Sequence, residues 1–380
     1  MSLSLFASPA GYFCCNSGIL ISLQVIAKMN RKLVKYLLAL AVAAVLLYFS
    51  FREVKWEDFI SALRNCSWGW IAAAMLAGVL SFLFRAARWR ELLLPIDSGI
   101  GKKVTFNAIN ISYIVNLVLP RVGEFVRCGF ITGHSAPDPE DRNRKLASYD
   151  KVLGTVVLER SWDVITMLLL VITLAVLMWG KFGDFFTDKV IEPFSARLDF
   201  SLWWVFAAIL ASGLAALWLL RRFRERSRAA SALLRFVNGL WQGALSCLKM
   251  KKAWLFFGYT LLIWAMYWFM SLAVLWAVQG MDTSALTPEF AGAVEKLAGL
   301  GAVDALFLML AGSLSSLVPV PGGFGAFHYI VAMALSSVYG VPFAVGIVFA
   351  TLSHESQTVT MLVCGGLSYA SESMSLAGKS

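Results

Sequence analysis

The stretch Asn116–Arg127, NLVLPRVGEFVR, begins inside an apolar run, Val104–Leu119, and then becomes polar and charged. It contains a proline, a glycine, two arginines and a glutamate in close succession: Pro120, Arg121, Gly123, Glu124 and Arg127. The apolar run itself is shorter than the roughly 20 residues that a helix needs to cross a hydrocarbon core, and it includes polar side chains. These are Asn107, Asn110, Ser112 and Asn116. Charges at the end of such a short segment require an explanation from the rest of the chain.

The composition is that of a membrane protein. The 380 residues are 59% hydrophobic and 15% charged, whereas soluble domains carry roughly 25% charged residues. Several apolar runs reach the length of a membrane-spanning helix. We therefore expect an all-α, polytopic bundle of about six to eight spans. The candidate crossings are Leu33–Phe51, Trp68–Phe84, Val152–Trp179, Leu202–Leu220, Ala253–Val278, Ala302–Val318, Phe324–Tyr339 and Val341–Leu367.

The two ends of the chain differ from this membrane domain. Residues 1–28 lack the basic region that begins a signal peptide, so we expect a non-native or disordered N-terminal extension. From Met29 the sequence begins like that of a bacterial inner-membrane protein. We expect one domain over residues 29–370 and a short tail over 371–380. The six cysteines are scattered and predict neither a disulfide framework nor a metal site.

Loop charge predicts the topology, because Lys and Arg are enriched in cytoplasmic loops. The segment Arg221–Lys252 holds nine basic residues and one acidic residue, and Arg85–Lys103 is also basic. The more acidic or balanced loops Arg52–Ser67, Lys181–Ser201 and Gly280–Leu300 should lie outside. With both termini cytoplasmic, these assignments agree only if Val104–Leu119 does not cross. We therefore expect a re-entrant helix, with a broken region near residues 104–127.

A second broken region is expected near residues 306–338. The stretch Ser316–Ile330, SLVPVPGGFGAFHYI, contains prolines that remove backbone donors and glycines that permit unusual backbone conformations. These are Pro319, Pro321, Gly322, Gly323 and Gly325. Irregular backbone at membrane depth is tolerated only where it packs in protein or lines a wet cavity. Paired interrupted segments in the two halves of a transporter are a pointer to its binding site.

A stripe of polar residues occupies one face of the helix predicted after the first break. Lys151, Thr155, Glu159 and Asp163 recur at a spacing of four, with Arg160 beside them. Ionisable residues at this depth are costly and mark functional sites by default. The alternative is that the Arg160–Glu159 pair only fixes the depth of the helix. Together with Arg121, Glu124 and Arg127, the stripe predicts a cationic cluster, and arginine suits phosphate because its planar fork donates two parallel hydrogen bonds.

Three ordered motifs resemble the membrane domain of lysylphosphatidylglycerol synthases. They are Asn116–Arg127, the stretch from Lys151 through Glu159, Arg160 and Asp163, and Pro321–Gly325. The likeness covers about Arg31–Leu367. It implies a flippase-like domain that moves lipids between leaflets, standing alone without the soluble aminoacyl-transferase domain. Aminoacyl-lipid synthesis is not implied.

Two histidines depart from the family's pattern. Family members usually carry a glutamate where this chain has His328, and often an arginine where it has His354, followed by Glu355. This difference implies another head group or a pH-sensitive one, because histidine changes charge near neutrality. The alternative is that both histidines are neutral hydrogen-bond partners between helices.

Two other basic groups have simpler interpretations. Arg85, Arg88 and Arg90 should be positive-inside residues that touch lipid phosphates, each adding roughly 1 kcal/mol of surface attraction, with a substrate role as the alternative. The Arg221–Lys252 segment should include an amphipathic helix on the inner leaflet. No nucleic-acid partner is expected, because topology already explains the charge.

Three functional hypotheses follow. The first is a lipid flippase or transporter, without catalytic residues, cofactor or metal, that binds an anionic phospholipid or a polyprenyl phosphate; homo-oligomerisation is left open. The second is an intramembrane enzyme acting on a lipid phosphate or polyprenyl-linked substrate, although the chain has no HExxH or GxSxG motif. The third is a lipid-binding membrane partner that transports nothing. The candidate substrate-binding residues are Asn116, Arg121, Glu124, Arg127, Lys151, Thr155, Glu159, Arg160, Asp163, Pro321, Gly322, Gly323, Gly325, His328, His354 and Glu355.

Overall fold

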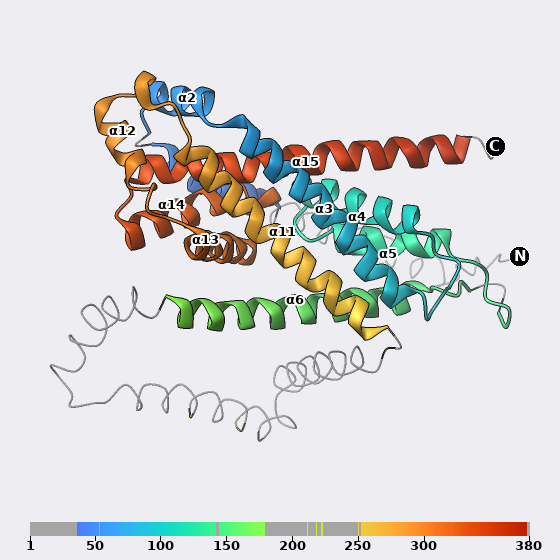
Figure 1. Ribbon diagram of the computed structural model, residues 1–380. Coiled ribbons are helices and arrows are strands. Elements are labelled where there is room, and N and C mark those ends of the chain that lie inside the picture. Colours follow the sequence, from blue (N-terminus) through green and yellow to red (C-terminus); the bar gives the residue numbers. More distant parts are fainter. Residues whose placement is uncertain are drawn as a thin grey trace, which may run out of the picture.

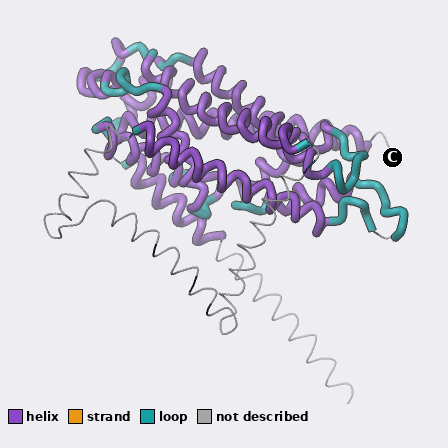
Figure 2. The backbone as a smooth tube through the Cα atoms, turned by 60° about the horizontal axis from the view of Figure 1, so that its bottom comes forward, coloured by secondary structure: helices purple, strands orange, loops and turns teal. Residues whose placement is uncertain are grey.

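The computed structural model shows a bundle of helices, with loops gathered mainly at its ends (Figures 1 and 2). It describes residues 36–178 without 53, 142 and 143, the single positions 211, 218 and 222, and residues 250–377 without 251. Over these residues there is no strand, apart from an isolated bridge between Pro137 and Lys145. The all-α prediction is confirmed. The expectations for residues 1–28, the crossing Leu202–Leu220 and nearly all of the Arg221–Lys252 loop lie outside the described residues.

Long helices form the body of the bundle. Helix α3 (Trp68–Leu93) packs along α11 (Ala253–Gln279), and in Figure 1 this pair runs obliquely across α15 (Phe343–Ala377) toward α6 (Tyr149–Leu177). Among the described helices, α3, α6 and α11 are long and apolar enough to cross a membrane. A helix over Tyr36–Phe51 and α2 (Trp56–Asn65) form a fourth candidate, although it bends by 89° between them. The structure thus supports three or four spans, and the count of six to eight stays a prediction.

The first predicted break is a helical hairpin. Helix α4 (Lys102–Val118) stops before Pro120, and α5 (Gly123–His134) returns beside it. The ends of the hairpin come together: Ser135 Oγ, after α5, donates to Asp97 Oδ2, before α4, at 2.6 Å. This geometry agrees with a segment that enters and leaves on the same side.

The second break is a hairpin of the same kind. Helix α13 (Ala302–Leu314) leads through the 3₁₀ turns η3 (Ser315–Leu317) and η4 (Pro321–Gly323) into α14 (Ala326–Tyr339). At the open end, Tyr339 Oη donates to Asp304 Oδ1 at 2.9 Å. Gly322, Gly323 and Gly325 all have positive φ values, of 58°, 79° and 78°, a region of backbone conformation that glycine enters without steric cost. The glycine-rich sequence is therefore what allows the chain to reverse here.

The tips of the two hairpins touch each other. Arg121, at the tip of the first, donates from Nη2 to the carbonyl of Ser316, at the tip of the second, at 3.0 Å. Helix α4 also contacts η4 directly. The two interrupted segments that the sequence pairs are thus neighbours in space.

Two of the loops predicted to be external meet at one end of the bundle, where α2 lies near α12 (Pro288–Glu295) in Figure 1. Asp282, just before the short turn η2 (Thr283–Ala285), donates its backbone N–H to the carbonyl of Asn65 at 3.1 Å. Nearby, Thr287 Oγ1 donates to Asp58 Oδ2 at 3.1 Å. Their common location agrees with the charge-based topology, and which side of the membrane they face stays a prediction.

Close packing of α15 against α4 depends on a glycine. A Cβ atom on Gly365 would lie 2.4 Å from Ile114 Cδ1 and 2.9 Å from the carbonyl oxygen of Asn110, whereas a Cβ on the adjacent Gly366 would meet nothing within 4 Å. We expect Gly365→Val to destabilise the protein by about 1–3 kcal/mol through overpacking, seen as a lower melting temperature in detergent. Gly366→Val is the matched control for helix propensity, and equal effects of both substitutions would contradict this packing.

Candidate functional site

Helix α6 supplies the carboxylates at the centre of the site. Its apolar sequence favours a long helix, and the spacing of four places Thr155, Glu159 and Asp163 on one face. Glu159 has 0% exposed side chain, and Thr155 Oγ1 accepts a hydrogen bond from the indole of Trp89 at 2.9 Å. Lys151, which the sequence places on the same face, does not join this group. Its ammonium is exposed and donates to the carbonyl of Leu146 at 3.3 Å.

Two arginines of α3 bind these carboxylates. Arg85 Nε donates to Glu159 Oε1 at 3.0 Å and its Nη2 donates to Asp163 Oδ2 at 2.6 Å. Arg88 Nη2 donates to Glu159 Oε1 at 3.1 Å and lies 2.8 Å from Asp163 Oδ1. Each carboxylate therefore lies between the same two guanidinium groups, and ion pairs connect α3 to α6.

Hydroxyl groups tie this pair of helices to two more. Arg85 Nη1 also donates to the hydroxyls of Tyr113, on α4, and Tyr267, on α11, at 3.2 Å each. Arg88 Nη1 donates to Thr260 Oγ1, also on α11, at 3.3 Å. The cluster thus lies where α3, α4, α6 and α11 converge.

A third arginine reaches the cluster from the first hairpin. The guanidinium of Arg127, on α5, stacks over the ring of Trp89 at 4.5 Å, and its Nη1 lies 2.9 Å from Glu159 Oε2. This ion pair lacks the angle of a hydrogen bond. All three guanidinium nitrogens of Arg127 are buried without a hydrogen-bond partner in the described part of the chain.

Arg160 forms the accessible edge of the cluster. Its side chain is 40% exposed and lies 3.5 Å from both Glu124 and Asp163. Glu124 accepts a hydrogen bond from Asn116 Nδ2 at 3.3 Å, and Asn116 Oδ1 accepts one from the backbone N–H of Gly123 at 2.7 Å. A Cβ on Gly123 would lie 2.1 Å from the carbonyl oxygen of Ser112, so only glycine fits at this close approach. The tip of the first hairpin therefore leads directly into the charged cluster.

We use the name arginine cluster for the four guanidinium and three carboxylate groups just described. Its members are Arg85, Arg88, Arg127, Arg160, Glu124, Glu159 and Asp163. On these described residues the cluster has one more positive than negative charge. Four of its buried guanidinium nitrogens take part in neither a hydrogen bond nor one of these ion pairs: Nε and Nη2 of Arg127 and the Nε atoms of Arg88 and Arg160. Each such donor costs about 1–3 kcal/mol when left unsatisfied, so the cluster is suited to an acceptor-rich anion.

The structure divides the predicted site residues into two groups. Asn116, Glu124, Arg127, Thr155, Glu159, Arg160 and Asp163 lie in or beside the arginine cluster. Arg121, Pro321, Gly322, Gly323, Gly325, His328, His354 and Glu355 lie at the hairpin tips or near the second tip. Lys151 lies apart from both.

The sequence interpretation missed Arg85 and Arg88. The prediction that they lie at the membrane surface and touch lipid phosphates there is wrong, because both are buried and paired with the carboxylates of α6. The alternative of a substrate role stays a prediction. Arg90 instead donates to the carbonyl of Ile100 at 2.8 Å. A signal was present, since Arg85, Arg88 and Trp89 occupy one face at a spacing of three to four. Tyr113 and Tyr267 gave no such signal in the sequence.

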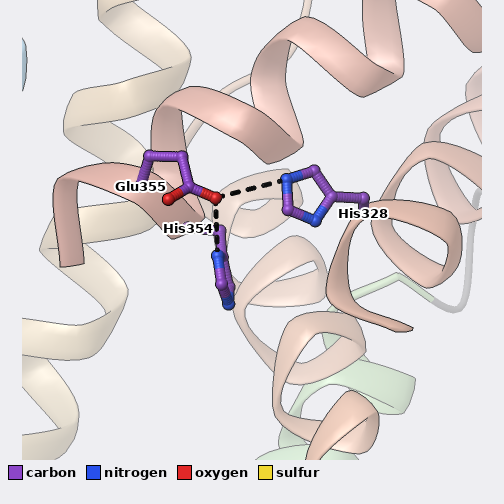
Figure 3. Close-up of side chains that lie close together, drawn as sticks. All are labelled: His328, His354 and Glu355. Carbon is purple, nitrogen blue, oxygen red and sulfur yellow. Dashed lines mark hydrogen bonds and ion pairs between the residues drawn. The ribbon is translucent and has the colours of Figure 1, made fainter. Parts of the chain in front are cut away.

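The two histidines lie beside the second hairpin tip (Figure 3). His354 Nε2 lies 2.9 Å from the carbonyl oxygen of Gly322, and its Nδ1 lies 3.0 Å from Glu355 Oε1. His328 Nε2 lies 3.6 Å from the same carboxylate oxygen. These three side chains could hold a metal ion by their ligand types and separations.

These features define a helical membrane protein with two broken hairpins that meet beside buried charge. A family model described as the lysylphosphatidylglycerol synthase TM region matches residues 36–365, and the chain belongs to this family. No curated protein matches it, and no solved structure does.

Glu159 should be the side chain on which the arginine cluster depends most. Glu159→Gln removes the charge that lies close to Arg85, Arg88 and Arg127, and breaking a buried pair in this way costs about 3–5 kcal/mol. We expect a large loss of folded protein, or a lower melting temperature, in fluorescence-detected size-exclusion chromatography. Glu124→Gln, whose ion-pair partner Arg160 is partly exposed, is the control, and should be much milder.

Proposed function

We propose that this protein binds the anionic head group of a phosphate-bearing membrane lipid at the arginine cluster and moves it between the leaflets. The observation that carries the proposal is the set of buried guanidinium donors without acceptors. A phosphate group offers several acceptor oxygens, and arginine donates to it in a bidentate manner. The excess of positive over negative charge favours an anion over a cation at the same place.

A groove for an acyl chain adjoins the cluster along α6. An apolar cavity of about 440 Å³ is lined by residues of α6, α13 and α14, including Met167, Val171 and Leu174 of α6. At 3.6 residues per turn, Met167, Val171 and Leu174 lie within about 80° of Asp163 around the helix, so the groove follows the side of α6 that carries Asp163. At 1.5 Å per residue, Val171 lies about 12 Å along the helix from Asp163. A charged site next to an apolar groove on one helix face matches the two parts of a lipid.

The contact between the two hairpin tips also supports a transport function. Broken backbone at membrane depth is characteristic of transporter binding sites, where carbonyl and N–H groups face a polar substrate. The arginine cluster follows directly after one tip, at Gly123 and Glu124, and the other tip touches Arg121. We propose an anionic phospholipid or a polyprenyl phosphate as the lipid class.

Reconstitution into vesicles tests the function and separates it from the alternatives. Vesicles would contain head-group-labelled phosphatidylglycerol in one leaflet, and its transfer would be followed by chemical quenching of the accessible label. Faster transfer of a chemically unchanged lipid supports the proposal. A modified lipid in the mass spectrum would instead support an enzyme, and binding without transfer would support a lipid-binding partner.

Substitutions at the accessible edge should slow transfer without unfolding the protein. We expect Arg160→Gln to reduce the initial transfer rate at least tenfold, because it removes the partly exposed cation at the entrance of the cluster. Arg64→Gln, at an exposed arginine of α2, removes the same charge elsewhere and should leave the rate unchanged. Normal transfer by the Arg160 variant would refute a head-group role for the cluster.

Filling the apolar groove should slow transfer independently of the charges. Ala334, on α14, lines the groove, and Ala334→Trp should reduce transfer several-fold, because a large side chain would occupy the place of the acyl chain. Val176→Trp, at a position of α6 that is 70% exposed, adds the same side chain outside the groove and is the control. Equal rates in the two variants would contradict an acyl-chain site.

A further inference from the structure

The cluster of His328, His354 and Glu355 brings together side chains from two helices (Figure 3). His328 belongs to α14, and His354 and Glu355 belong to α15. Glu355 Oε1 lies 3.0 Å from His354 Nδ1 and 3.6 Å from His328 Nε2. One ligand atom of each residue lies within 4.8 Å of the others. Both rings thus point toward the same carboxylate oxygen.

The hydrogen bond of His354 fixes where its proton lies. Nε2 faces the carbonyl oxygen of Gly322 at 2.9 Å, and a carbonyl only accepts, so Nε2 carries the hydrogen. In the neutral ring Nδ1 then has a lone pair, and this lone pair faces the carboxylate oxygen of Glu355. Two acceptors at 3.0 Å repel each other unless a positive charge lies between them, either a proton or a metal ion.

His328 faces the same carboxylate oxygen in an apolar setting. Its ring is 2% exposed and packs against the rings of Phe51, Phe327 and His354. Its Nδ1 has no hydrogen-bond partner among the residues described by the structure. Protonating both rings would place two cations beside a single carboxylate, and burying unbalanced charge is costly. With the proton of His328 on Nδ1, one divalent ion shared by the three groups would bind the lone pairs of both rings at once.

We propose that His328 Nε2, His354 Nδ1 and Glu355 Oε1 form a binding site for a divalent transition-metal ion of the zinc type. Two imidazoles and a carboxylate suit this class of ion. In a tetrahedral zinc site with bonds of about 2.0–2.1 Å, ligand atoms lie about 3.3–3.4 Å apart, and the two separations to Glu355 fall on either side of this value. The bond from His354 to the Gly322 carbonyl is the outer contact that orients a metal-binding histidine.

The site would join the second hairpin tip to α15. The Gly322 carbonyl belongs to the glycine-rich turn, and His354 connects it to the metal. Three protein ligands leave the fourth position of a tetrahedral ion to water or an anion. The proposal does not rest on lipid transport, because it follows from the three side chains alone.

Cobalt binding tests the site in the intact, detergent-purified protein. The chain would be purified with a tag that lacks histidine, treated with a chelator and titrated with Co²⁺, whose visible absorption reports tetrahedral nitrogen and oxygen ligation. We expect one Co²⁺ per chain, displaced by Zn²⁺. Absence of stoichiometric binding, or an octahedral spectrum that Zn²⁺ does not displace, would overturn the proposal as showing an adventitious ion only.

Variants locate the bound ion. His328→Gln and His354→Gln should each weaken Co²⁺ binding at least tenfold. His134→Gln is the matched control, because His134 also lies beside a carboxylate, Glu372, at 2.6 Å, but outside the proposed site; it should bind Co²⁺ like the native chain. If a histidine variant does not fold, Glu355→Gln decides the matter, since that side chain is 41% exposed and tolerates substitution. Native affinity in Glu355→Gln, or loss of binding in His134→Gln, would overturn the assignment.

Discussion

The interaction on which this structure depends is that of Glu159 with three arginines. A carboxylate with no exposed surface lies within 3.1 Å of guanidinium groups from α3 and α5. None of these charges is stable alone in an apolar surrounding, so α3, α5 and α6 are required to meet at this point. Hydrophobic packing in a membrane is non-directional, because lipid tails are as apolar as the side chains. The arginine cluster supplies the directional contacts that specify which helix faces adjoin.

The same cluster joins the fold to the proposed function. Its donors exceed its acceptors, it begins directly behind the first hairpin tip, and an apolar groove lies farther along α6 on the side that carries Asp163. The cluster that holds the helices together therefore also has guanidinium donors that no protein acceptor occupies. In the proposed function, structural and substrate-binding roles are divided among these residues, with Glu159 at the buried centre and Arg160 at the accessible edge.

Local sequence predicted the parts of this architecture that depend on local chemistry. Pro120 and Gly123 predicted the first break, the Pro-Gly-Gly-Phe-Gly turn predicted the second, and the spacing of four placed Thr155, Glu159 and Asp163 on one face. The partners of those carboxylates were not predictable in the same way. An arginine near the end of an apolar helix has the same sequence signature whether it faces lipid phosphate or a buried acid, so Arg85 and Arg88 were assigned to the surface. The roles of Tyr113 and Tyr267 depend on how α4 and α11 rotate about their axes, which the sequence does not specify.

Helix α15 contacts both hairpins at separate levels. Near its middle His354 binds the Gly322 carbonyl at the second tip, and farther along Glu372 accepts from Asn107 of α4 and lies 2.6 Å from His134 of α5, near the open end of the first hairpin. Eighteen residues of continuous helix separate these contacts, or about 27 Å. An α-helix is stiff along its axis, so α15 holds its two contact points at a fixed separation. While the contacts of His354 and Glu372 both persist, neither hairpin can move along α15 without an equal movement of the other.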